Sequence, residues 1–269
     1  MKHFAVAACL CLLLAVPSTG FAESGPHAEV SILPGWRQAD GHHMAALKID
    51  LDSGWKTYWR APGEAGIPPR IDWVGSENLA GVWAHWPVPE IITSNGVTTL
   101  GFAGELVLPF EVRPVDREAD IPLEVWLAFG ICKEVCTPLH VELSAVLPAD
   151  SKAQNPRILG ALAARPDTAE EAAVAGAACA IEEIADGLRL TARLDMPPVG
   201  AEEFVAVEAE DPTIWISEAV VRREQNVLIA EADLVPPQAK PFPLDPQTLR
   251  FTVIAGGRGV DIRGCSVAR

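Results

Sequence analysis

Apolar and polar residues alternate through most of this chain, and short turn sequences interrupt the alternation at regular intervals. Residues 106–112 and 123–131 are two clear period-two sets. Successive side chains of a strand point to opposite faces, so a period of two predicts strands with one buried face. Turn signals such as Asp52-Ser53-Gly54 and Ser94-Asn95-Gly96 separate the sets. This pattern predicts an antiparallel, immunoglobulin-like sandwich over residues 23–148.

The pattern changes after Pro148. Asn155 followed by Pro156 predicts the start of a short helix. Alanine and glutamate predict a second helical piece over residues 168–174. Residues 149–176 are therefore predicted to be a helical linker, and renewed alternation over residues 177–269 predicts a second, smaller β-sandwich. The predicted fold class is all-β, with two β-sandwich domains joined by a short helical connector.

The N-terminus predicts export. A basic start, an apolar run over residues 4–16 and a small-residue end at Ala22 are typical of a secretory signal, here residues 1–22. The run is too short to span a bilayer comfortably, and the mature chain is predicted to have no direct membrane span. Cys9 and Cys11 lie inside this run and are excluded from the functional argument. The formal net charge of −15 argues against nucleic acid as a partner.

The four remaining cysteines are of two kinds. In the chain-entropy model, a bond between Cys179 and Cys265 closes a long loop and is worth roughly 4.5 kcal/mol, whereas a bond between Cys132 and Cys136 is worth roughly 2 kcal/mol. Sequence alone does not fix the connectivity. Loop length nevertheless favours a structural disulfide for the distant pair. Because a bond in the close pair would add little stability, it indicates a role other than stabilisation.

The close pair brackets the predicted tip of a hairpin formed by residues 123–131 and 139–143. Residues four apart at a tip can face each other at a separation that a disulfide tolerates. A partner thiolate can reach a sulfur there, which thiol-disulfide exchange requires. Lys133 can favour the thiolate, and Glu134 can oppose it or take up a proton. A passive hairpin clip is the alternative reading of the same spacing.

Several further motifs of the first domain follow one another in a fixed order. They are Gly54-Trp-Lys-Thr-Tyr-Trp-Arg-Ala-Pro-Gly63, Gly66-Ile-Pro-Pro69, Ile71-Asp-Trp73, Trp86-Pro87, Gly101-Phe-Ala-Gly104, Leu106-Val-Leu-Pro109 and Cys132-Lys-Glu-Val-Cys-Thr-Pro138. Together they resemble the N-terminal periplasmic domain of the DsbD disulfide reductase family, and more closely its ScsB-like branch, known for copper tolerance. The resemblance covers roughly residues 28–147.

The resemblance implies a periplasmic protein-disulfide reductase-type relay without a cofactor. In it, Cys132 and Cys136 take electrons from a membrane-embedded DsbD/CcdA-like electron transporter and pass them to periplasmic thioredoxin-fold proteins. By family analogy Cys136 attacks first, a choice that the residues themselves leave open. Aromatic residues near this motif imply that Trp55 and Tyr58 line the site.

The sequence departs from the family in two respects. Longer members continue into a transmembrane carrier and a thioredoxin-like domain, whereas this chain ends at Arg269. We therefore expect either that a separate membrane protein reduces it or that it has another function. The family's cap loop carries an aromatic side chain, but the corresponding residues 92–99 hold none. Phe102 is the nearest candidate for a lining aromatic.

Two other functions stay open at this point. His42, His43 and Met44 offer soft and borderline ligands, and together with the close cysteine pair they could hold copper(I) in a periplasmic copper-binding or copper-tolerance module. No zinc spacing is present, and no metal is assigned in the leading reading. The third possibility is a purely structural β-domain.

Overall fold

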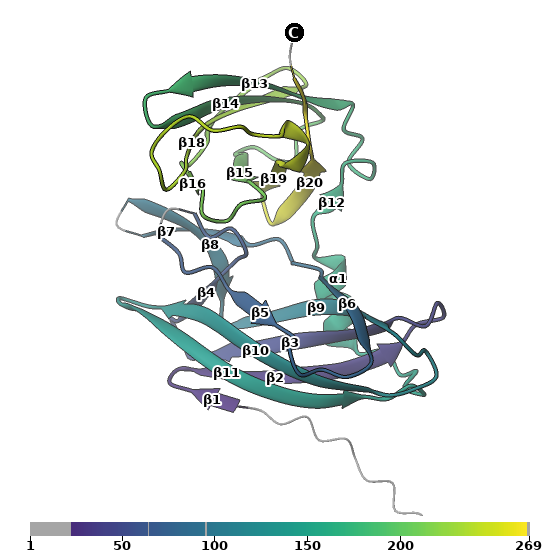
Figure 1. The fold of residues 1–269 in the computed structure, drawn as a ribbon. Helices are drawn as coiled ribbons and strands as arrows, with labels where there is room; N and C mark the ends of the chain where they lie inside the picture. Colours follow the sequence, from purple (N-terminus) through teal and green to yellow (C-terminus); the bar gives the residue numbers. More distant parts are fainter. Residues whose placement is uncertain (1–22, 64, 95, 268–269) are drawn as a thin grey trace, which may run out of the picture.

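The computed structural model describes residues 23–63, 65–94 and 96–267 and shows two β-sandwiches, one above the other in Figure 1. The prediction of an all-β fold with two sandwiches, the first immunoglobulin-like, is confirmed. The predicted signal peptide lies outside the described residues. Within the described part of the chain, no helix is long and apolar enough to cross a membrane.

The first sandwich consists of two sheets that enclose one apolar core. One sheet has the order β1(Glu23–Gly25), β2(Ala28–Arg37), β3(His43–Leu51), β9(Glu105–Pro114) and β6(Leu79–Ala84). The other has the order β11(Cys136–Leu147), β10(Ile121–Cys132), β4(Lys56–Tyr58), β8(Val97–Ala103) and β7(Glu90–Ser94), and β5(Arg70–Asp72) pairs with β10. The alternating apolar residues of both sheets point inward, as the period of two predicts.

The second sandwich repeats this arrangement on a smaller scale. One of its sheets has the order β12(Asp167–Thr168), β20(Arg258–Arg263), β19(Arg250–Ala255) and β15(Phe204–Glu208). The other has the order β16(Trp215–Ile216), β18(Val227–Val235), β14(Gly187–Asp195), β13(Gly176–Ile184) and β21(Ser266–Val267), and β17(Val220–Glu224) pairs with β18. A 3-10 turn, η1(Pro246–Thr248), precedes β19.

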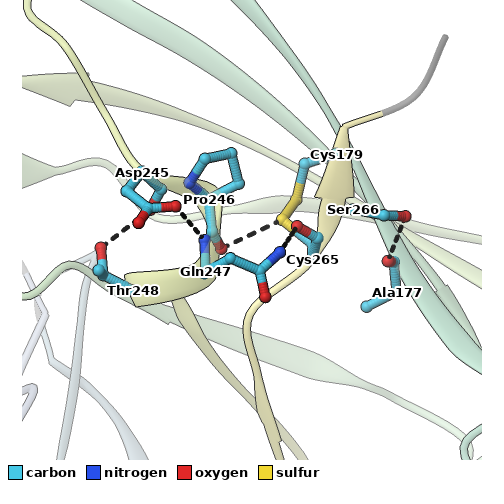
Figure 2. Close-up of a disulfide and its surroundings, with 8 residues drawn as sticks. All are labelled: Ala177, Cys179, Asp245, Pro246, Gln247, Thr248, Cys265 and Ser266. Carbon is cyan, nitrogen blue, oxygen red and sulfur yellow. Dashed lines mark hydrogen bonds between the residues drawn. A yellow bond between two sulfur atoms is a disulfide. The ribbon is translucent and has the colours of Figure 1, made fainter.

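A disulfide joins the two ends of the second sandwich. Cys179 on β13 is bonded to Cys265 across 86 positions of sequence, with the Cα atoms 5.8 Å apart. Figure 2 shows the η1 turn beside this bond, where the Gln247 side-chain amide donates to the Cys265 carbonyl at 2.8 Å. Both cysteines are buried. The bond therefore fixes the C-terminal residues to the start of this sandwich.

The connector is helical only in its first half. α1(Pro156–Ala163) begins after Asn155, whose side chain accepts a hydrogen bond from the Arg157 amide, as the sequence predicts. Ile158 is fully buried against the outer face of the first sheet, so α1 packs on the first sandwich. The prediction of a second helix over residues 168–174 is wrong. Instead, β12 pairs in parallel with β20, and the turns that follow are held by Glu171, which accepts from the Thr168 amide.

The two sandwiches share a packed, polar-edged interface. Ala206 and Ile254 of the second sandwich belong to the apolar core of the first. Beside them, Arg60 forms two hydrogen bonds with the Glu208 carboxylate, each 2.9 Å long, and a third with the Thr252 hydroxyl. The guanidinium also lies 3.7 Å from the centroid of the Trp59 ring.

Candidate functional site

The close cysteine pair lies at the tip of the longest hairpin in the described residues. β10 and β11 pair without interruption from Ile121 opposite Leu147 to Cys132 opposite Cys136. The two cysteines form a disulfide with their Cα atoms 4.1 Å apart. Lys133 and Glu134 are exposed in the connecting turn, and Val135 beside them is 73% exposed. The strand ladder therefore delivers both sulfurs to a solvent-facing tip.

The two cysteines differ in their exposure to solvent. Cys132 is only 7% exposed, because it continues β10 and pairs with Lys56 of β4 on its other side. Cys136 begins the outer strand of the sheet and is exposed. Thiol-disulfide exchange needs access along the S–S bond to the sulfur that is attacked. Of the two cysteines, Cys136 is the more accessible to a thiolate from another molecule.

Tyr58 contacts the exposed cysteine from the end of β4. Its hydroxyl lies 3.1 Å from the Cys136 sulfur, and the side chain is only 2% exposed. Burial raises the pKa of Tyr58 above its ordinary value of 10.0, so the hydroxyl keeps its proton at neutral pH. A protonated hydroxyl at this distance can donate to a thiolate on Cys136, which stabilises the charged form. The structure thus brings together Tyr58 and the cysteine pair.

A loop with described residues 61–63 and 65–69, which we call the Gly66 loop, covers the inner side of this tyrosine. A Cβ atom built on Gly66 would lie 2.9 Å from a ring carbon of Tyr58, and one built on Gly130 would lie 2.6 Å from Cβ of Ile67. Only glycine at both positions permits this close approach without displacing a neighbour. Sequence reasoning did not assign this loop to the site, although the Gly66-Ile-Pro-Pro69 motif marks it.

The side chain of Lys133, in the hairpin turn, lies against the tight turn formed by Ser53 and Gly54. Gly54 has a φ of +81°, and a Cβ atom there would lie 3.2 Å from Cε of Lys133. The lysine ammonium is 3.5 Å from the Ser53 carbonyl. This contact holds a positive charge on the hairpin tip, whereas Glu134 projects into solvent. A cation near the tip favours a thiolate.

The other two predicted lining aromatics, Trp55 and Phe102, make contacts of different kinds. Trp55 stacks on His27 with ring centroids 4.3 Å apart, one residue before Lys56. Phe102 is opposite Thr57 in the β4–β8 ladder. Cys132 is opposite Lys56, the residue of β4 that precedes Thr57. Opposed residues share a face and successive residues alternate, so Phe102 faces the core. The assignment of Phe102 to the site is wrong, because its ring belongs to the core and stacks on Trp86.

The proposed copper ligands do not meet the cysteines. β3 begins at His43 and runs for 9 residues before the turn that leads to β4 and the disulfide. His43 is fully buried and its Nε2–H donates to the Pro34 carbonyl, while Met44 packs in the apolar cluster under α1. Within residues 23–63, 65–94 and 96–267, no group of three or more His, Cys, Asp or Glu side chains could hold a metal ion. The copper reading is therefore not supported.

A protein family and a solved structure are similar to this chain. Residues 29–148 match the family model described as "Thiol:disulfide interchange protein DsbD, N-terminal". The fold is similar to that of a solved structure, the N-terminal periplasmic domain of ScsB from Proteus mirabilis, with a TM-score of 0.69. The two sequences are 22% identical, and the match covers 91% of this chain and 97% of that one. No curated protein sequence matches the chain.

Proposed function

We propose, from the premise that residues 29–148 are a domain of the DsbD N-terminal type, that this chain relays electrons in the periplasm through Cys132 and Cys136. The signal peptide is expected to be removed near Ala22 before the protein acts. The electron donor is a membrane-embedded transporter of the DsbD/CcdA kind. The acceptors are periplasmic thiol-disulfide proteins with a thioredoxin fold.

One observation carries the proposal, namely that Cys136 is an exposed residue whose sulfur lies within hydrogen-bonding distance of the buried Tyr58 hydroxyl. In a passive clip, this hydrogen bond only satisfies the buried hydroxyl. In a nucleophile it does more, because a hydrogen bond to the thiolate increases the fraction of thiolate at neutral pH. We therefore assign attack to Cys136 and resolution to Cys132.

The cycle balances as two successive exchanges. In the reduced protein, the Cys136 thiolate attacks one sulfur of the partner's disulfide, and the partner's second sulfur leaves as a thiolate. The Cys132 thiolate then attacks the Cys136 sulfur, which re-forms the intramolecular bond and releases the partner as a dithiol. Two electrons pass to the partner. The membrane transporter restores the dithiol by the reverse exchange.

Trapping and redox titration test this assignment together. Changing Cys132 to alanine should accumulate a mixed disulfide between Cys136 and a periplasmic partner, visible as a thiol-sensitive band on non-reducing gels. Changing Cys136 to alanine should abolish that band. The wild-type pair should titrate at a potential above about −300 mV. A potential below that value, with no band from either variant, would identify the pair as a structural clip.

A further inference from the structure

A cleft of about 490 Å³ lies between the two sandwiches. Its upper wall consists of β15, residue 209 and residues 211–219. Its lower wall consists of residues 60–63, Gly66 and Pro68 together with Thr98 and Leu100. In Figure 1, β15 and β16 stand above β7 and β8 in this region. The volume lies within the range typical of ligand sites, which occur preferentially at domain interfaces.

The upper wall offers an unused strand edge. β15 is the last strand of its sheet, and all five of its residues line the cleft. Among the described residues, its backbone hydrogen bonds run to β19 alone. An edge strand of this kind is a template for another strand, because its outward N–H and C=O groups have no ladder partner. Five residues offer roughly 16 Å of edge, enough for a short extended peptide.

The side chains around this edge indicate the character of the occupant. Trp215 is 47% exposed, and Ile214 and Phe204 add apolar surface beside it. Asp211 stands exposed on the same wall, so a cationic side chain suits the rim. β-Strand addition uses main-chain hydrogen bonds for affinity and side-chain pockets for specificity. The negative rim adds a preference for a cationic segment.

We propose that this cleft binds an extended, cationic polypeptide segment of another protein, which adds to the free edge of β15. The cleft shares a wall with the redox site, since Gly66 lines the cleft and contacts the ring of Tyr58. A bound segment therefore lies on one side of the Gly66 loop, while the cysteines lie beyond it. The interaction needs no cysteine in the segment and goes beyond the exchange function proposed above.

Hydrogen exchange on the oxidised, full mature chain tests the interaction directly. The probe is the capped synthetic peptide Lys-Val-Thr-Val-Thr-Val-Lys, which has no thiol. Saturating peptide should slow amide exchange in residues 204–208 and leave the β10–β11 hairpin unchanged. Absence of protection in residues 204–208 at millimolar peptide overturns the proposal. Protection that instead appears with rising protein concentration and no peptide also overturns it, because the occupant is then a second copy of the chain.

Two variants and one control separate binding in the cleft from binding elsewhere. Thr98→Trp fills the lower wall and should weaken the affinity roughly tenfold, which corresponds to about 1.4 kcal/mol. Asp211→Lys on the exposed rim should weaken it as well, without a change in the core. Asp186→Lys makes the same charge change at an exposed turn outside the cleft and should leave affinity unaltered. Equal affinity of all three variants for the peptide contradicts the proposal. Equal affinity of the wild type for a peptide with glutamate in place of lysine also contradicts it.

Discussion

Removal of the Glu208 carboxylate should destabilise the protein far more than removal of an equally well-formed surface ion pair. The side chains of Arg60 and Glu208 are only 13% and 17% exposed, and two hydrogen bonds of 2.9 Å join them. In Glu208→Ala, the guanidinium stays charged but loses its carboxylate. It also remains close to Arg250, whose guanidinium lies 3.9 Å from Glu208 in the wild type. Stranding a buried charge in this way costs about 3 kcal/mol.

This cost should lower the melting temperature by roughly 6 to 12 °C for a chain of this size, as measured by differential scanning calorimetry. The matched control is Asp233→Ala. Asp233 also makes two hydrogen bonds with one arginine, Arg189, at 2.8 and 3.0 Å, but the two side chains are 32% and 44% exposed. We expect a much smaller shift there, because water and salt screen exposed pairs.

A third variant identifies the cause of the loss. Replacing Arg60 with methionine and Glu208 with leucine together removes both charges and keeps the interface filled. If the single variant suffers from a stranded charge, the double variant should recover most of the melting temperature. Equal losses in Glu208→Ala and Asp233→Ala, or no recovery in the double variant, would refute the reasoning.

Three further predictions concern single sites. Tyr58→Phe should raise the pKa of the Cys136 thiol by about one unit, because the thiolate loses its hydrogen bond. The pH dependence of alkylation of the reduced protein measures this pKa, and an unchanged profile would exclude the tyrosine from thiolate stabilisation. Burial lowers the pKa of His43 from 6.5 to about 4. Between these two pH values, the imidazole is protonated in the unfolded state and neutral in the folded state. Stability should therefore fall as pH drops from about 6.5 to about 4, and His43→Leu should flatten that part of a denaturation profile. Replacing Cys179 and Cys265 with alanine should reduce the free energy of unfolding by roughly 4 kcal/mol and leave disulfide exchange by the mature protein intact.

Local patterns in the sequence predicted the strands and the hairpin tip well. Alternation over residues 123–131 fixes which side chains of β10 are buried, and the short spacing of Cys132 and Cys136 places them opposite each other at its end. The resemblance to a known family directed attention to Tyr58, which contacts Cys136. These features depend on residues that are near one another in the chain or in a recognisable motif.

Features that depend on neighbours distant in sequence were not predictable in the same way. Alternation shows that Phe102 lies in a strand with one buried face, but it does not show that Thr57, rather than Lys56, is opposite it. Nothing local to Arg60 indicates a partner 148 positions away. The residues over 168–174 have helical propensity, yet Thr168 pairs with Asp261 of β20 and residues 169–173 form turns.

The uninterrupted ladder of β10 and β11 has a consequence for recognition. Eleven residue pairs precede the one between Cys132 and Cys136, and they fix the backbone of the hairpin without help from the sulfur bond. Under the proposed relay, opening that bond should therefore leave the backbone of the tip unchanged. A partner would then recognise the redox state from the sulfur atoms themselves rather than from the conformation of the protein. These atoms would be a neutral bonded pair in the oxidised state and a thiolate beside a tyrosine hydroxyl in the reduced state.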